Sequence, residues 1–163
     1  MDEKARPEEV NDSPIDILLV EDDEADIEIT LRAFEKGRLK NNVSVARDGE
    51  EALDFVYHKG KYQDEKKFHR PDLILLDIRM PKLDGFEVLK KLKSDPHYNF
   101  ISVAMLTSSK NEEDVCKSYG YGAASYIPKP VSFEEFKKVV DGFNFYWHII
   151  SKLPTGKFPT KIS

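Results

Sequence analysis

Residues 73–85 read Leu-Ile-Leu-Leu-Asp-Ile-Arg-Met-Pro-Lys-Leu-Asp-Gly. The first four are apolar without alternation, which is typical of a strand buried on both faces of a parallel sheet. Asp77 follows at the carboxyl end of that strand, where open α/β sheets bind their ligands. Because Pro81 and the Asp84-Gly85 pair indicate a turn, the sequence predicts a carboxylate above a loop at the edge of the sheet.

Three other apolar runs also end at polar side chains. Residues 15–20 are followed by Glu21-Asp22-Asp23-Glu24, residues 101–106 by Thr107-Ser108, and residues 123–127 by Pro128-Lys129-Pro130. The carboxyl ends of parallel strands meet at one edge of a sheet. We therefore expect that edge to carry three carboxylates, a hydroxyl and an ammonium group.

The composition predicts one soluble globular domain without a membrane segment. The chain has 163 residues, of which 40% are hydrophobic and 34% charged,. A net charge of −5 and a pI of about 5.5 argue against a nucleic-acid partner,. No apolar stretch approaches the roughly 20 residues of a membrane span, and no signal peptide is visible, so we expect a cytoplasmic protein.

Two residue types are informative mainly through their number and spacing. Cys116 is the single cysteine, which excludes an internal disulfide and predicts a small apolar side chain in a packed position,. The histidines show no metal-ligand spacing, and we expect all four at the surface: His58, His69, His97 and His148.

Strand and helix patterns alternate along the chain, which predicts a parallel sheet with helices on both faces. The predicted helices are 25–36, one opening at the Asp48-Gly49 turn, 86–94, 111–119 and 132–153, and a short strand covers 43–46. Residues 1–14 and 154–163 are expected to be tails. The lysine-rich stretch Lys59–Arg70 is long for a connection in such a fold, and both a solvated insertion and a partner-binding loop remain open,.

Together these residues resemble a known family, the receiver domain of two-component response regulators. The residues that carry the resemblance are Glu21-Asp22, Asp77, Met80-Pro81, Asp84-Gly85, Thr107 and Lys129-Pro130. The resemblance covers residues 15–153 and implies a flavodoxin-like fold of five strands in the order 2-1-3-4-5, five helices and an extended last helix.

Three further features resemble the single-domain regulators that partner phytochrome-type histidine kinases. They are the insertion before Pro71, the helix start after Asn111, and the aromatic end with Tyr146-Trp147. The chain departs from the usual pattern at Ser102, where proline is common, and at Pro128. The resemblance thus implies a histidine kinase as the partner.

The resemblance implies that Asp77 accepts a phosphoryl group in a reaction that depends on Mg²⁺. It assigns Asp22, Asp77 and the main-chain carbonyl of Arg79 as direct metal ligands, with Glu21 acting mostly through water. Clustered acids hold a proton unless a cation intervenes, and Mg²⁺ suits hard oxygen ligands and retained waters. Lys129 is assigned to the phosphoryl oxygens. An alternative for the acid pair is a helix start favoured by the dipole.

The same resemblance makes Thr107 and Tyr126 the switch residues. Thr107 would donate its hydroxyl to the phosphoryl group and leave space for Tyr126 to turn inward; an ordinary strand-end threonine and a buried core tyrosine are the alternatives. Arg79 and Ser109 occupy positions that tune dephosphorylation in the family. Pro130 suggests a cis peptide bond after Lys129.

The last predicted helix offers two apolar surfaces. One face packs on the sheet, and a second strip holds Val139, Tyr146 and Ile149,. A core helix needs only one such face, so the strip predicts a partner surface and a homodimer, unless the helix end folds back onto its own domain.

Three classes of function are compatible with these observations. The first is a phosphorylatable signalling switch. The second is a phosphohydrolase with Asp77 as nucleophile, against which stands Arg79, because such enzymes usually carry an acid two residues after the nucleophile. The third is a receiver-like scaffold that accepts no phosphate, against which stand the intact Asp22, Thr107 and Lys129.

Overall fold

The computed structural model describes residues 15–36, 41–108, 112–139 and 142. In these residues five parallel strands form one sheet in the order β2-β1-β3-β4-β5. The strands are β1 Ile15–Val20, β2 Asn41–Ala46, β3 Leu73–Asp77, β4 Ser102–Thr107 and β5 Ser125–Pro128. The predicted strand order and the parallel arrangement are both confirmed.

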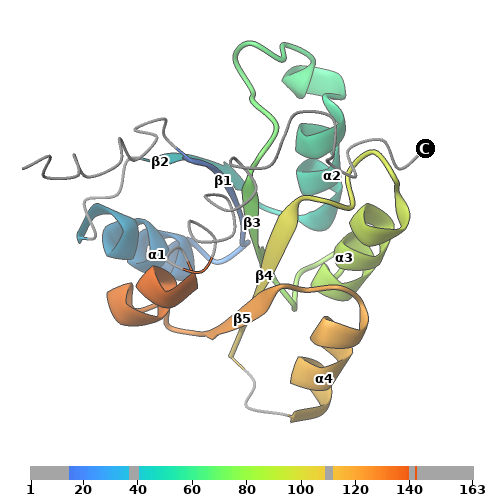
Figure 1. Cartoon of the computed structure of the whole chain (residues 1–163). Helices are drawn as coiled ribbons and strands as arrows, with labels where there is room; N and C mark the ends of the chain where they lie inside the picture. The colour runs from blue at the N-terminus through green and yellow to red at the C-terminus, as the bar shows by residue number, and fades with distance from the viewer. Residues whose placement is uncertain (1–14, 37–40, 109–111, 140–141, 143–163) are drawn as a thin grey trace, which may run out of the picture.

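Helices cover both faces of this sheet. The described helices are α1 Glu24–Lys36, α2 Gly49–Tyr57, α3 Gly85–Ser94, α4 Glu112–Gly120 and the short 3-10 helix η1 Gly60–Tyr62, and residues 133–139 are also helical. Figure 1 shows α1 and residues 133–139 on one face, and α2, α3 and α4 on the other. Among the described residues, no helix combines the length and apolar character that a membrane span requires.

Strand β3 shows why its sequence does not alternate. Successive side chains of a strand point to opposite faces, and both faces here are covered. Ile74 and Leu76 join the core beneath α2 and α3, while Leu73 and Leu75 join the core beneath α1. Each such buried side chain contributes about 1.5–3 kcal/mol through the hydrophobic effect. The uniform apolar run is thus the sequence of a central strand.

Side-chain caps fix where three helices begin. Asp48 and Asp84 each accept a hydrogen bond from the backbone N–H three residues further on, at 2.8 and 3.0 Å. Ser132 accepts the equivalent bond at 3.2 Å. Such a cap contributes about 1 kcal/mol to stability. The helix starts predicted at Asp48-Gly49 and at residue 132 are confirmed.

The Lys59–Arg70 insertion is better anchored than a solvated loop. Tyr62 is buried, and its ring lies 5.0 Å from those of both Phe55 and Phe68. His58 is in the left-handed region with φ of 55°, and its Nε2 lies 2.7 Å from the carbonyl oxygen of Phe68. The prediction of His58 as a surface residue is therefore wrong. The sequence does not predict this anchoring, because Tyr62 and Phe68 do not follow the periodicity of a helix or a strand.

The other predicted surface histidines have different outcomes. His69 and His97 are exposed, as predicted. His148 lies outside the described residues.

The predicted partner strip of the last helix is only partly within the described residues. Val139 is half-buried and packs against the core cluster that contains Ile127 and Phe136. Its side chain contacts the core of its own domain, and its place on a partner surface stays a prediction. Tyr146 and Ile149, and the predicted run to Leu153, lie outside the described residues.

Gly85 marks the closest approach between β3 and α3. A Cβ atom placed on Gly85 would lie 2.2 Å from the carbonyl oxygen of Asp77 and 2.8 Å from Cα of Ile78. The N–H of Gly85 donates to the carbonyl of Ile78 at 2.8 Å. Because these neighbours are backbone atoms, they cannot rotate away, and the helix start is held against the strand end.

We expect Gly85→Ala to lower the free energy of unfolding by about 1–3 kcal/mol, as overpacking does in well-packed sites. The matched control is Gly120→Ala in α4, where an added Cβ meets nothing within 4 Å. Urea denaturation of the purified proteins measures both. Equal stability of the two variants would contradict this account of the β3–α3 contact.

Candidate functional site

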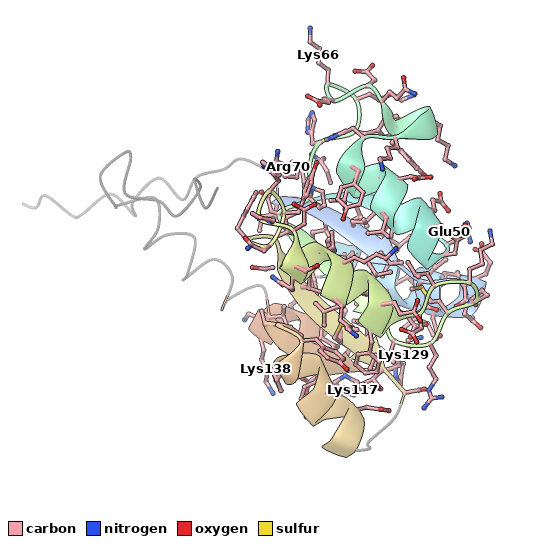
Figure 2. The ribbon with its side chains drawn as sticks, turned by 90° about the vertical axis from the view of Figure 1, so that its right-hand side faces the viewer. Glu50, Lys66, Arg70, Lys117, Lys129 and Lys138 are labelled. Carbon is pink, nitrogen blue, oxygen red and sulfur yellow. The ribbon has the colours of Figure 1, made fainter. Side chains whose placement is uncertain are left out.

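Four strand ends bring the predicted site residues to one edge of the sheet. Glu21 follows β1, Asp77 ends β3, Thr107 ends β4 and Lys129 follows β5. Backbone hydrogen bonds continue the sheet at this edge: Glu21 N–H to Ala46 at 3.0 Å and Lys129 N–H to Thr107 at 2.8 Å. Figure 2 labels Lys129 at this side of the molecule. The sheet therefore holds these side chains in place through its own backbone.

The ammonium group of Lys129 lies among three carboxylates. Its Nζ is 2.6 Å from Glu21 Oε2, 3.0 Å from Asp77 Oδ2 and 3.3 Å from Asp26 Oδ2. Glu21 and Asp77 are 1% and 4% exposed. The contact with Asp26, in the first turn of α1, is not predicted by the sequence patterns. Asp26 thus serves both the helix start and the site,.

Burial and charge set the protonation of this cluster. Burial raises the pKa of Glu21 to about 7, against the lowering effect of Lys129, and the charge of Asp77 raises it further. Burial alone would lower the pKa of Lys129, but the close carboxylates of Glu21 and Asp77 outweigh burial and raise it. The two pKa shifts have one explanation. The ammonium of Lys129 stays charged, but its single charge cannot balance the charges of two buried carboxylates.

The donor set fits a hard divalent cation. Glu21, Asp22 and Asp77 each offer a carboxylate oxygen, and these atoms lie within 4.8 Å of one another. Glu21 Oε2 has no aligned hydrogen bond among the described residues, although Lys129 lies close to it. Asp22 is exposed, which leaves the cluster open to water. Mg²⁺ prefers a few carboxylates beside retained waters, so these residues match its coordination.

Arg79 turns its backbone toward the cluster and its side chain away from it. Its N–H donates to Asp77 Oδ1 at 3.3 Å. Its guanidinium is exposed and lies 3.8 Å from Asp114 Oδ2 in α4. The main-chain carbonyl of Arg79 as a metal ligand stays a prediction, and Ser109 lies outside the described residues.

The two predicted switch residues differ in exposure. Thr107 is buried, with 4% of its surface exposed, while Tyr126 is 38% exposed and meets the edge of the Tyr119 ring at 6.1 Å. The alternative of a buried core tyrosine at this position is therefore wrong. The peptide bond between Lys129 and Pro130 is cis, as the sequence suggested.

Comparison with known proteins gives a consistent result. Residues 17–141 match the family described as the response regulator receiver domain. The chain is 37% identical over 137 residues to the probable methanogenesis regulatory protein FilR2 of Methanothrix harundinacea, covering 83% of this chain and 85% of that protein. It is 36% identical over 138 residues to response regulator Rcp1 of Synechocystis, covering 85% and 92%.

Solved structures resemble the chain over most of its length. The bacteriophytochrome response regulator AtBRR superposes with a TM-score of 0.74 at 44% identity, covering 83% of this chain and 96% of that one. The phosphorylated cyanobacterial phytochrome response regulator RcpA gives 0.70 at 37% identity, covering 88% and 100%. The Mn²⁺-bound form of Rcp1 gives 0.68 at 36% identity, covering 87% and 100%.

Replacing Lys129 by Met leaves Glu21 and Asp77 facing each other without their shared cation. At pH 8 without metal, we expect the free energy of unfolding to fall by about 3 kcal/mol, as for other buried pairs that lose one partner. Because the ammonium competes with a metal for the same oxygens, Mg²⁺ should bind the variant more tightly than the wild type and restore stability. Thermal melts against Mg²⁺ concentration measure both effects.

The control is Lys91→Met, which removes an exposed charge on α3. Its stability and its response to Mg²⁺ should match the wild type. If Lys129→Met binds Mg²⁺ no better than this control, Lys129 and the metal do not share their ligands.

Proposed function

Because this chain belongs to the response regulator receiver domain family, we propose that it is a signalling switch that accepts a phosphoryl group on Asp77 from a histidine kinase. The grouping of buried Asp77 with Glu21, Asp22 and Lys129 carries the proposal. A phosphoryl group brings negative charge to an already acidic site, so transfer depends on positioning and on cations more than on covalent assistance. At this edge of the sheet, the strand ends position Asp77, Lys129 supplies one positive charge, and the three acids offer ligands for a metal ion.

In the proposed reaction an oxygen of Asp77 attacks the phosphorus of a phosphohistidine. The new oxygen–phosphorus bond forms while the phosphorus–nitrogen bond breaks, and the nitrogen leaves with the bonding electrons. Lys129, 3.0 Å from Oδ2, is close enough to meet the incoming phosphoryl oxygens. Mg²⁺ bound by Asp22, Asp77 and the main-chain carbonyl of Arg79, with Glu21 acting mostly through water, would supply the remaining positive charge.

The switch that follows is a shift between two arrangements. The phosphoryl group adds about −1.5 to −2 charge at Asp77. The ammonium of Lys129 then turns from Glu21 toward it, and the hydroxyl of Thr107 follows. Tyr126 starts from an exposed position, so it is free to rotate toward the space that Thr107 leaves. A ligand or modification changes the populations only as far as it favours one arrangement.

The geometry favours this function over turnover by a phosphohydrolase. An acid/base residue two positions after the nucleophile would be needed, and that position holds Arg79, whose guanidinium pairs with Asp114. We accordingly propose that the chemistry is limited to self-phosphorylation from a phosphodonor and loss of that phosphate. The acidic cluster with its lysine likewise favours a phosphate acceptor over an inert scaffold.

The relatives suggest which kinase to test. AtBRR and RcpA are named as phytochrome response regulators, and we propose a phytochrome-type histidine kinase as the partner, in the cytosol. A homodimer stays a proposal that rests on the sequence of the last helix, chiefly Tyr146 and Ile149. Sedimentation of a variant with glutamate at both positions, beside the wild type, tests it.

Asp77→Asn keeps the shape of the side chain and removes the nucleophile, so we expect it to take up no phosphate from acetyl phosphate with Mg²⁺. The wild type should take up one hydroxylamine-labile phosphoryl group per chain, read by intact mass spectrometry. Asp54→Asn, an exposed change of equal charge on α2, should behave like the wild type.

The same assay separates the rival functions. Continued release of phosphate over many turnovers would identify a phosphohydrolase. A wild type that takes up no phosphate would identify the scaffold, and equal labelling of Asp77→Asn would remove Asp77 as the acceptor.

A further inference from the structure

The edge of the sheet opposite Asp77 carries a second built surface. Lys66, Lys67 and Arg70 come from the insertion that precedes β3, and Phe100 comes from the connection that precedes β4. Arg70 and Phe100 stand just before β3 and β4, so they lie at the amino ends of the sheet. Lys67 lines a hollow there with Asp16 of β1 and Asn42 of β2. Lys66 projects from the tip of the insertion, at the top of Figure 2. We call these four residues the basic edge. Figure 2 shows Arg70 and Lys129 at opposite sides of the molecule.

The insertion is held in shape before any partner arrives. The hydroxyl of Tyr62 donates to Glu51 Oε1 of α2 at 2.5 Å. Phe68 packs edge-on against Phe55 at 6.0 Å, and the carbonyl of Phe68 is close to the His58 ring. A surface that is already ordered loses little conformational entropy on binding. The anchors face inward, and the charged side chains of the basic edge are exposed.

Arg70 is presented on an aromatic platform. Its guanidinium carbon lies 5.7 Å from the ring centre of Tyr98 and 5.4 Å from that of Phe100. Phe100 is 53% exposed, so its ring is accessible to a partner. These distances allow cation–π contact with both rings, and the N–H groups of a guanidinium can bind a carboxylate in the bidentate manner,.

The cations of the basic edge form no ion pairs within the described part of the chain. Three ion pairs lie in or beside the insertion within residues 15–36, 41–108, 112–139 and 142. They involve other cations, namely His58, Lys61 and His69. The stretch 59–70 carries five lysine and arginine residues against two acids, in a chain whose net charge is −5. The local charge is thus opposite in sign to that of the whole protein.

We propose that the basic edge binds an acidic segment of a partner protein, with Arg70 receiving a carboxylate and Phe100 receiving an apolar side chain beside it. Asp64 and Glu65 stand within the same insertion. They oppose a long polyanion such as nucleic acid or a charged bilayer, as does the net charge of the chain. Both acids have partners inside the insertion: Asp64 Oδ1 accepts from the N–H groups of Lys66 and Lys67, and Glu65 Oε1 lies 3.9 Å from His58 Nδ1.

The basic edge lies at the end of β3 opposite to Asp77. Strand β3 separates Arg70 from Asp77, and its five residues span about 16 Å,. A partner on the basic edge therefore leaves the edge that holds Asp77 accessible, so tethering and phosphotransfer can occur at once. The inference goes beyond the proposed function, because it does not require Asp77 to accept phosphate.

Fluorescence anisotropy with a labelled glutamate-rich peptide that contains phenylalanine tests the binding at low salt. We expect Lys67→Gln with Arg70→Gln to weaken binding about tenfold, equivalent to roughly 1.4 kcal/mol. Phe100→Ser should weaken it by a smaller factor without loss of stability, since this side chain is exposed. Lys91→Gln with Lys137→Gln, an equal change of charge at exposed positions on other faces, should match the wild type. Asp77→Asn should also bind normally.

Other occupants give different results in the same experiment. Equal weakening by the two charge variants would overturn the proposal, because binding would then follow net charge alone. Tighter binding to phosphatidylserine vesicles or single-stranded DNA than to the peptide would overturn the assignment to a protein segment. Peptide binding that appears only after removal of residues 1–14 would overturn the assignment to a partner and make the acidic tail of this chain the occupant.

Discussion

The Lys129 ammonium lies between two buried carboxylates, Glu21 and Asp77, and cannot neutralise both. Much of the chemistry at this edge of the sheet follows from the imbalance. Burial raises the pKa of Glu21 and leaves the cluster short of positive charge. A divalent cation would meet two buried carboxylates that share one ammonium, with Glu21 Oε2 lacking an aligned hydrogen bond. The charge imbalance of the resting protein therefore favours a cation, and a phosphoryl group would need that cation before it could approach the acids.

Much of the site could be predicted because each of its residues ends a recognisable strand. The apolar runs before Glu21, Asp77 and Thr107 stop abruptly, and parallel strands bring such stops to one edge. The contact of Asp26 with Lys129 could not be predicted in this way. It depends on how α1 is rotated against β5, which a helical period alone does not give.

The remaining differences come from side-chain packing that hydrophobic periodicity does not reveal. Tyr62 and Phe68 anchor an insertion whose composition is mostly polar, through ring contacts with Phe55 and a hydrogen bond from Tyr62 to Glu51. His58 is drawn inward by the same contacts. Val139 packs on its own core because the chain after β5 returns toward α1. The amphipathic pattern of one helix does not show in which direction that helix runs across the sheet.

The ion pair between Lys129 and Asp26 joins residues 103 positions apart, and this separation bears on how the protein folds. Contacts between distant residues form late, since the chain must first lose the entropy of closing a long loop. Until β5 arrives with Lys129, the paired strands β1 and β3 bring Glu21 and Asp77 together with no ammonium between them. A chain in which β1 and β3 had paired before β5 joined would carry electrostatic repulsion at this edge of the sheet, and the arrival of Lys129 would reduce it.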